Sequence, residues 1–167
     1  MRKFEEFLKK KTIIKKSSDI FRSRDLILES DRKYANLKEI LEKIGLKSDN
    51  SNDIIEQCYD ILIYLIRAKL YSEGYVAKGN SSHEAEISYL KILGFSDKEI
   101  EFMDELRFFR NRIKYDGKKL DENYAKKVLD FVSKASKKLK KHLEWNIKIS
   151  LNFVAIRFSE KFQKEKS

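Results

Sequence analysis

The chain contains no proline and only five glycines, so little in it interrupts a helix. Lysine and glutamate, which favour helices, are abundant. Its 167 residues suit one domain, and the isoleucine, leucine, phenylalanine and tyrosine content is ample for one buried core. The composition therefore predicts an all-α protein that consists of one domain with appendages.

Residues that carry chemistry are few. The single cysteine, Cys58, excludes an internal disulfide, and its apolar neighbours indicate a small buried hydrophobe. The two histidines, His83 and His142, lie far apart without companion cysteines or spaced carboxylates, so no metal site is expected. The chain also lacks a glycine-rich phosphate loop and a serine elbow, which removes support for folds that hydrolyse nucleotides or transfer acyl groups. We expect no cofactor.

Long apolar runs are missing as well. The longest apolar cluster, residues 61–66, is far too short to span a bilayer, and the N-terminus has no extended apolar signal region. We expect a soluble, cytoplasmic protein that has no membrane partner.

Positive charge is plentiful and unevenly placed. The formal net charge is +10. Residues 1–50 carry 14 basic and 9 acidic side chains, residues 51–100 carry 5 and 8, and residues 101–167 carry 18 and 10. This distribution points to anionic partners, although a generic lysine-rich surface gives the same totals.

Apolar residues recur at helical spacing along most of the chain. The expected helices are a short arm over residues 2–16, one from Ser17 or Ser18 to Ile44, a long apolar one from Asp53, one from His83 to Leu93, one between a Ser96 capping box and Gly117, and one from Asp121. We predict an antiparallel bundle of four or five helices. Residues 1–50 form a basic N-terminal helical extension, residues 51–144 the bundle core, and residues 145–167 a C-terminal extension.

The C-terminal extension has an ambiguous pattern. Ile147, Ile149, Leu151 and Phe153 alternate as in a strand, whereas Ile147, Leu151, Val154 and Phe158 fit one face of a helix. A lone strand has no obvious partner in a helical chain, so a helix is the preferred interpretation.

One segment, residues 107–117, concentrates functional groups beside an apolar stripe. At about 100° per residue, the core edge is formed by Phe102, Leu106, Phe109 and Ile113. One flank then carries Arg107, Arg110, Asn111 and Lys114, and Tyr115 lies one turn beyond Asn111. This pattern predicts an anion-binding surface with a hydrogen-bonding edge. The alternative is an ordinary solvated basic flank.

Over roughly residues 53–140 the chain resembles the HEPN domains, helical bundles of higher eukaryotes and prokaryotes that bind nucleotides. The resemblance rests on Arg67-Ala68-Lys69, on Ser82-His83-Glu84-Ala85 and, most specifically, on Arg110-Asn111-Arg112-Ile113-Lys114-Tyr115. In ribonuclease members, an arginine and a following polar residue precede a histidine, and two copies of the motif meet across a homodimer to cleave RNA without metal. Arg110 and Asn111 match this motif, but Tyr115 stands in place of the histidine.

This departure changes the function that the resemblance implies. Histidine moves protons near neutral pH, whereas a tyrosine side chain ordinarily has a pKa of about 10. The preferred hypothesis is a homodimeric module that binds RNA, a nucleotide or a small nucleotidyltransferase partner of the toxin–antitoxin type. Its binding residues would be Arg107, Arg110, Asn111, Lys114 and Tyr115, and a second subunit would cover Phe108. The alternatives are a metal-independent endoribonuclease with Arg110, Asn111 and Tyr115 as catalytic residues, and a helical structural protein without a nucleic-acid role.

Overall fold

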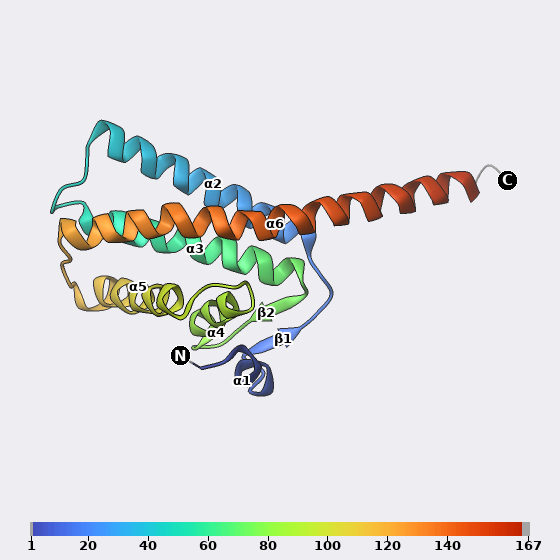
Figure 1. The fold of residues 1–167 in the computed structure, drawn as a ribbon, viewed down its shortest axis with the longest axis horizontal. Helices are drawn as coiled ribbons and strands as arrows, with labels where there is room; N and C mark the ends of the chain where they lie inside the picture. The colour runs from blue at the N-terminus through green and yellow to red at the C-terminus, as the bar shows by residue number, and fades with distance from the viewer. Residues whose placement is uncertain (1, 165–167) are drawn as a thin grey trace.

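The computed structural model describes the backbone of residues 2–164 and the side chains of residues 2–143 (Figure 1). Its helices are α1 (Phe4–Lys9), α2 (Ile20–Lys43), α3 (Ser51–Ser72), α4 (Ser82–Ser88), the 3₁₀ turn η1 (Tyr89–Lys91), α5 (Asp97–Asp116) and α6 (Glu122–Lys164). Two short strands, β1 (Ile13–Lys15) and β2 (Tyr75–Ala77), pair with each other. The prediction of a mostly helical protein is confirmed.

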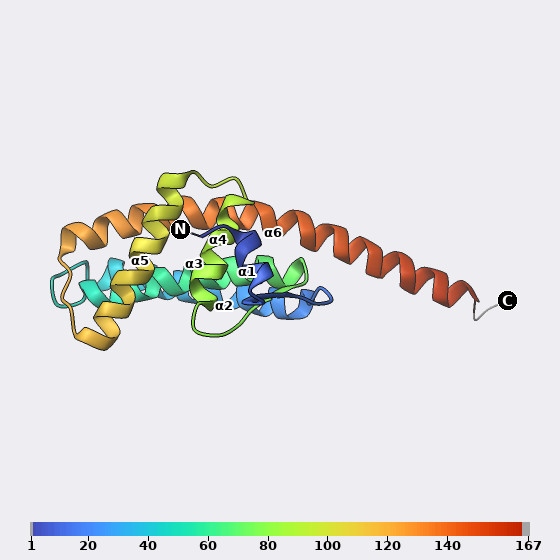
Figure 2. The ribbon, with the colours of Figure 1, turned by 90° about the horizontal axis from the view of Figure 1, so that it is seen from below.

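Helix α3 is the centre of the fold. It contacts α2, α4, α5 and α6, and Figure 1 shows α2 and α5 on opposite sides of it. Most of its circumference is apolar, which is why it is surrounded by the other helices. Helix α2 lies along α3 through its longest interface, although its residues belong to the predicted N-terminal extension. Helix α6 continues to Lys164 and projects beyond the other helices, as Figures 1 and 2 show.

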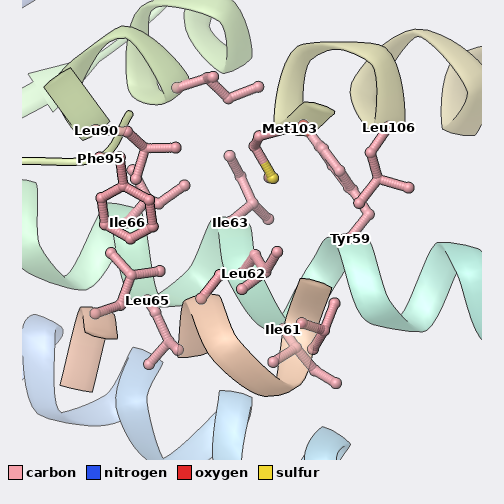
Figure 3. Close-up of a cluster of buried hydrophobic side chains, with 14 of the residues drawn as sticks. Tyr59, Ile61, Leu62, Ile63, Leu65, Ile66, Leu90, Phe95, Met103 and Leu106 are labelled. Carbon is pink, nitrogen blue, oxygen red and sulfur yellow. The ribbon is translucent and has the colours of Figure 1, made fainter. Parts of the chain in front are cut away.

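The core surrounds α3 on the sides of α2, α5 and α6, and Figure 3 shows part of it. Leu62, Leu65 and Ile66 of α3 are at most 1% exposed. On the other side of α3, Met103 and Leu106 of α5 are fully buried and lie beside Ile63 and Tyr59. Burial of a side chain of this size contributes roughly 1.5–3 kcal/mol. This packing holds α5 at a fixed position against α3.

The N-terminal arm differs from the prediction of one helix over residues 2–16. Helix α1 ends at Lys9, and Ile13–Lys15 then runs antiparallel to Tyr75–Ala77, with Ile13 opposite Ala77. The buried side chains of Phe7 and Ile13 hold the arm on the bundle. A helix through residue 16 would forgo the strand pairing that satisfies the backbone groups of β1 and β2. The sequence could not indicate this, because a three-residue strand has no clear periodicity.

Gly74 makes the close approach between the arm and the end of α3 possible. Its φ is +77°, and a Cβ atom there would lie 2.4 Å from the backbone oxygen of Lys16. In turn, the Lys16 amide donates a hydrogen bond of 2.7 Å to the Gly74 carbonyl. Only glycine combines this left-handed conformation with the required space.

A second contact ties the arm to α4. The guanidinium of Arg2 donates to both carboxylate oxygens of Glu84, at 3.0 Å from Nε and 2.6 Å from Nη2. Its Cζ atom also lies 4.7 Å from the centre of the Phe7 ring. The arm therefore braces the short helix that follows β2.

The helix ends agree with the sequence in α5 and differ elsewhere. Ser96 and Glu99 form the predicted capping box, and Gly117 ends α5 in the left-handed conformation at φ +64°. At α2 the cap is Asp19, whose carboxylate accepts from the Arg22 amide at 2.9 Å, rather than Ser17 or Ser18. The helix predicted from His83 to Leu93 is α4 followed by the tighter turn η1.

In the part of the chain that the structure describes, no helix is both long enough and apolar enough to cross a bilayer.

Candidate functional site

Helix α5 presents the predicted residues in two separate places. Arg107 and Arg110 are partly buried against α3 and α4, with 25% and 17% of their side chains exposed. Asn111 is half-buried, whereas Lys114 and Tyr115 are exposed, Tyr115 at 77%. Among the described side chains, no hydrogen bond joins Asn111 to Tyr115. The structure thus brings the two arginines together and leaves Tyr115 in solvent.

The predicted core stripe of α5 is partly correct. Leu106 is fully buried, and Phe102 and Ile113 pack against the core at its edge. Phe109 is half-buried, with its ring centre 5.1 Å from that of Tyr124. The fully buried residue that the stripe omitted is Met103, one position along the helix from Phe102.

Arg110 has an incomplete set of partners. Its Nη2 atom is 4.0 Å from Asp60 Oδ1, at the limit of an ion pair, and the other oxygen of Asp60 accepts from Lys33 Nζ at 3.2 Å. Its Cζ atom lies 5.6 Å from the centre of the Tyr59 ring. The Nε–H group is buried and has no hydrogen-bond acceptor among the described residues. A partly buried guanidinium in this state gains free energy when an anion binds to it.

His83 lies next to Arg110 through a shared tyrosine. The hydroxyl of Tyr59 is 2.7 Å from His83 Nδ1, and the two rings are stacked with an angle of 12° between their planes. Burial raises the pKa of Tyr59 above its ordinary value, so the phenol keeps its proton and shares a hydrogen bond with Nδ1. In the tautomer of neutral His83 that carries its hydrogen on Nε2, the phenol is the donor.

The charges around His83 favour its neutral form. Its pKa is lowered from the ordinary value, first by burial, while the carboxylate of Glu86 opposes that effect. The positive charges of Arg67, Arg110 and Arg107 lower the pKa further. Three guanidiniums from two helices therefore act on one imidazole.

Two of these three arginines already have good carboxylate partners. Arg67 donates to both oxygens of Glu86, from Nε at 2.6 Å and from Nη2 at 3.0 Å, and the Glu86 side chain is only 3% exposed. Arg107 donates from Nε to Asp104 at 2.7 Å. Arg110 is the arginine of this cluster with the weakest carboxylate contact. We call Tyr59, Arg67, His83, Glu86, Arg107 and Arg110 the arginine–histidine cluster.

Sequence reasoning missed the part of this cluster that lies outside α5. His83 and Tyr59 meet only because α4 folds onto α3. A partial signal was present: Arg67 and Glu86 each stand among apolar neighbours, and a buried charge requires a partner of opposite sign. That signal pairs α3 with α4 and so places His83 beside α3.

Two further kinds of reactive site that a protein can have are a cysteine thiol and a cluster of metal ligands. Burial raises the pKa of the Cys58 thiol to about 12, which keeps it protonated and inert. No group of three or more His, Cys, Asp or Glu side chains among the described residues is placed to hold a metal ion.

No protein-family model, curated protein or solved structure matches this chain.

Proposed function

We propose that the protein is a HEPN-like RNA-binding module, built as an antiparallel bundle of four or five helices. In this proposal Arg110 makes the central phosphate contact, and Arg107, Asn111, Lys114 and Tyr115 extend the contact along α5. The observation that carries it is the state of Arg110: its guanidinium is mostly covered, its Nε–H group is unpaired, and its nearest carboxylate is shared with Lys33. A phosphate oxygen supplies the missing acceptor.

The residues around Arg110 also favour an anion as the ligand. In the tautomer with its hydrogen on Nε2, the neutral His83 ring can donate to an anion without adding a buried charge. On the segment of residues 107–119, six side chains are basic and one is acidic. A polyanion can therefore contact the partly buried guanidinium of Arg110 and is also attracted by the other positive charges along this segment.

The direct test is binding of a fluorescein-labelled RNA 12-mer, followed by fluorescence anisotropy over a range of salt concentrations. Arg110→Gln should weaken binding about 10- to 100-fold at low salt, since a charge-assisted hydrogen bond contributes roughly 1.5–3 kcal/mol. The slope of log K against log salt should also become shallower by about 0.7, the contribution of one phosphate contact on a single strand.

A matched control is Arg32→Gln. Arg32 is an exposed arginine of α2 that is paired with Glu29 at 2.6 Å. Arg32→Gln changes the net charge by the same amount as Arg110→Gln. It should leave the RNA affinity and its salt dependence nearly unchanged. Equal losses in Arg110→Gln and Arg32→Gln would reduce the effect to net charge and contradict a site at Arg110.

A second function, metal-independent cleavage of RNA, is favoured by one observation. His83 stands beside Arg110 through Tyr59, so a group that can take a proton near pH 7 lies close to a phosphate-binding guanidinium. In EDTA, the wild type would release 2′,3′-cyclic phosphate ends. Loss of these ends in His83→Asn would support His83 as the base, and loss in Tyr115→Phe would support the motif tyrosine. If the wild type leaves the RNA intact, cleavage is contradicted and only the binding function remains.

Homodimerisation is a separate part of the proposal. Sedimentation velocity at micromolar concentration should give a dimer, and a strict monomer would contradict a site that is built from two subunits.

A nucleotide or a nucleotidyltransferase could also bind at the arginine–histidine cluster. Such a ligand should compete with RNA for binding to the wild type, and it should compete less well for Arg110→Gln.

A further inference from the structure

The outer face of α3 lies between α2 on one side and α4 and α5 on the other. It carries four half-buried residues at helical spacing: Asp60, Tyr64, Arg67 and Tyr71. From α2, Lys33 donates to Asp60 at 3.2 Å. Arg22 of the same helix lies over the Tyr71 ring, 5.7 Å from its centre. From α5, Arg110 comes within 4.0 Å of Asp60. Side chains of the neighbouring helices therefore border this face over about 16.5 Å.

Beside Tyr64 this face opens into a hollow of about 410 Å³, a volume within the range of small-molecule sites. Residues of α2 and α3 line it: Arg22, Asp25, Leu26, Glu29, Tyr64 and Arg67. The hollow adjoins the candidate site, because Arg67 belongs both to the hollow and to the arginine–histidine cluster. We call the hollow and its lining the α2–α3 groove.

Tyr64 is placed to act together with Arg110. Asp60, the residue that Arg110 approaches, precedes Tyr64 by one helical turn, which is about 6 Å along α3. Lys33 connects the two positions, since its Nζ atom donates to Asp60 and lies 5.8 Å from the Tyr64 ring centre. A phosphate bound at Arg110 therefore brings the nucleoside attached to it within reach of the Tyr64 ring. A half-buried ring of this kind is a surface on which a flat base can stack.

The charges in the groove favour a base over a second phosphate. Two cations and two carboxylates line it: Arg22, Arg67, Asp25 and Glu29. The ion-pair partners of Arg67 and Glu29, which are Glu86 and Arg32, add one charge of each sign. A phosphate would gain no net attraction from this balanced set and would approach the carboxylates. The edge of a nucleobase carries hydrogen-bond donors and acceptors together, and a lining of guanidiniums and carboxylates can pair with both.

We propose that the α2–α3 groove binds the nucleobase of the nucleotide whose phosphate contacts Arg110, with the base stacked on Tyr64. This proposal rests on the proposed RNA-binding function and adds to it a subsite for one base. Different helices then hold the two parts of the ligand, since the phosphate is bound from α5 and the base lies between α2 and α3. The protein should bind a free ribonucleoside monophosphate more tightly than the sugar phosphate alone.

The test is isothermal titration calorimetry at low salt with uridine 5′-monophosphate and with ribose 5-phosphate, which lacks the base. The wild type should bind the nucleotide about 5- to 150-fold more tightly than the sugar phosphate, the range for one stacked base. Tyr64→Leu should lose this preference and keep its affinity for ribose 5-phosphate. Tyr64→Phe keeps the ring and should retain the preference. Arg110→Gln should weaken the binding of both ligands.

Tyr34→Leu is the matched control. Tyr34 is another half-buried tyrosine with a lysine over its ring, since the Nζ atom of Lys38 lies 5.3 Å from the ring centre. It belongs to α2 and is not among the residues that line the groove. Tyr34→Leu should leave the affinity for the nucleotide unchanged, and thermal melts compare the stability of the two leucine variants.

A second measurement uses the wild type alone. Under ultraviolet light, 5-iodouridine 5′-monophosphate attaches to an aromatic side chain that its base contacts. Peptide mapping by mass spectrometry should place the attachment at Tyr64. Attachment at another residue, such as the exposed Tyr115, would overturn the groove as the base site.

The outcomes separate this proposal from the proposed function. If the wild type binds the nucleotide and the sugar phosphate equally and Arg110→Gln still weakens both, the base subsite is overturned and the phosphate contact stands. If neither these ligands nor RNA binds at low salt, both proposals fall. An equal loss of nucleotide affinity in Tyr34→Leu and Tyr64→Leu would also overturn stacking on Tyr64.

Discussion

RNA affinity should rise as the pH falls from about 7.5 to about 5.5, and His83 is the residue that we expect to carry this dependence. In the free protein, burial and the charges of Arg67, Arg110 and Arg107 lower the pKa of His83 from its ordinary value, against the opposing effect of Glu86. A phosphate bound at Arg110 adds negative charge beside the ring, which raises the pKa of His83 in the complex. Binding therefore takes up a proton wherever the complex is more protonated than the free protein.

The size of the effect is limited by the number of titrating groups. One linked proton changes log K by at most one per pH unit, so affinity gains no more than about tenfold for each unit. Tyr59, whose pKa is raised by burial, stays protonated throughout this range and adds nothing. The dependence should flatten above neutral pH, where His83 is neutral in both states.

The assay is RNA anisotropy at constant ionic strength across this pH range, with His83→Asn and His142→Asn compared to wild type. The asparagine side chain of the first variant can still accept a hydrogen bond from Tyr59, which favours retention of the fold. His142, on α6, supplies the control. The first variant should lose the pH dependence and the second should keep it. A flat wild-type profile, or an unchanged slope in His83→Asn, would refute the assignment of the proton to His83.

Three further predictions concern stability. Tyr59→Phe removes the hydroxyl that is hydrogen-bonded to His83, and urea titration should show a free energy of unfolding that is lower by about 0.5–1.5 kcal/mol. An unchanged free energy of unfolding would show that this hydrogen bond does not stabilise the fold. Without RNA, wild-type stability should be full above about pH 6.5 and fall as the pH drops toward the lowered folded-state pKa of His83, because the unfolded chain binds the proton more readily; thermal melts of His83→Asn should lack this component. Gly74→Ala should destabilise by several kcal/mol and Gly79→Ala by only about 1 kcal/mol, since both have positive φ but a Cβ atom would meet backbone only at Gly74; similar melting temperatures for the two would contradict this.

Local signals in the sequence were sufficient for much of the fold. The Ser96 capping box and the terminating Gly117 define α5, because both act within a few residues of the helix end. The apolar residues of α3 likewise identify its central position before any contact is known. The β1–β2 pairing was not predictable, since it depends on residues far apart in the chain and each strand has three residues.

The candidate site, too, was predicted only where the signal lies within one helix. Arg107 and Arg110 were found because they share one helix with the apolar stripe. His83 was set aside because its relation to Arg110 depends on α4 folding onto α3, which no spacing along α5 encodes. The position of Tyr115 on α5 was correct, but its separation from the arginine–histidine cluster depends on which side of α5 faces α3 and α4.

The pairing of β1 with β2 has a consequence for synthesis. Ile13 and Ala77 are 64 positions apart, so the arm emerges long before the strand that it pairs with. At about 5–20 residues per second, the ribosome needs roughly 3–13 s to make the intervening chain. During that interval the apolar side chains of Phe4, Phe7 and Ile13 have no native surface to cover them. The arm therefore reaches its final place only after β2 has been made, although it is synthesised well before that strand.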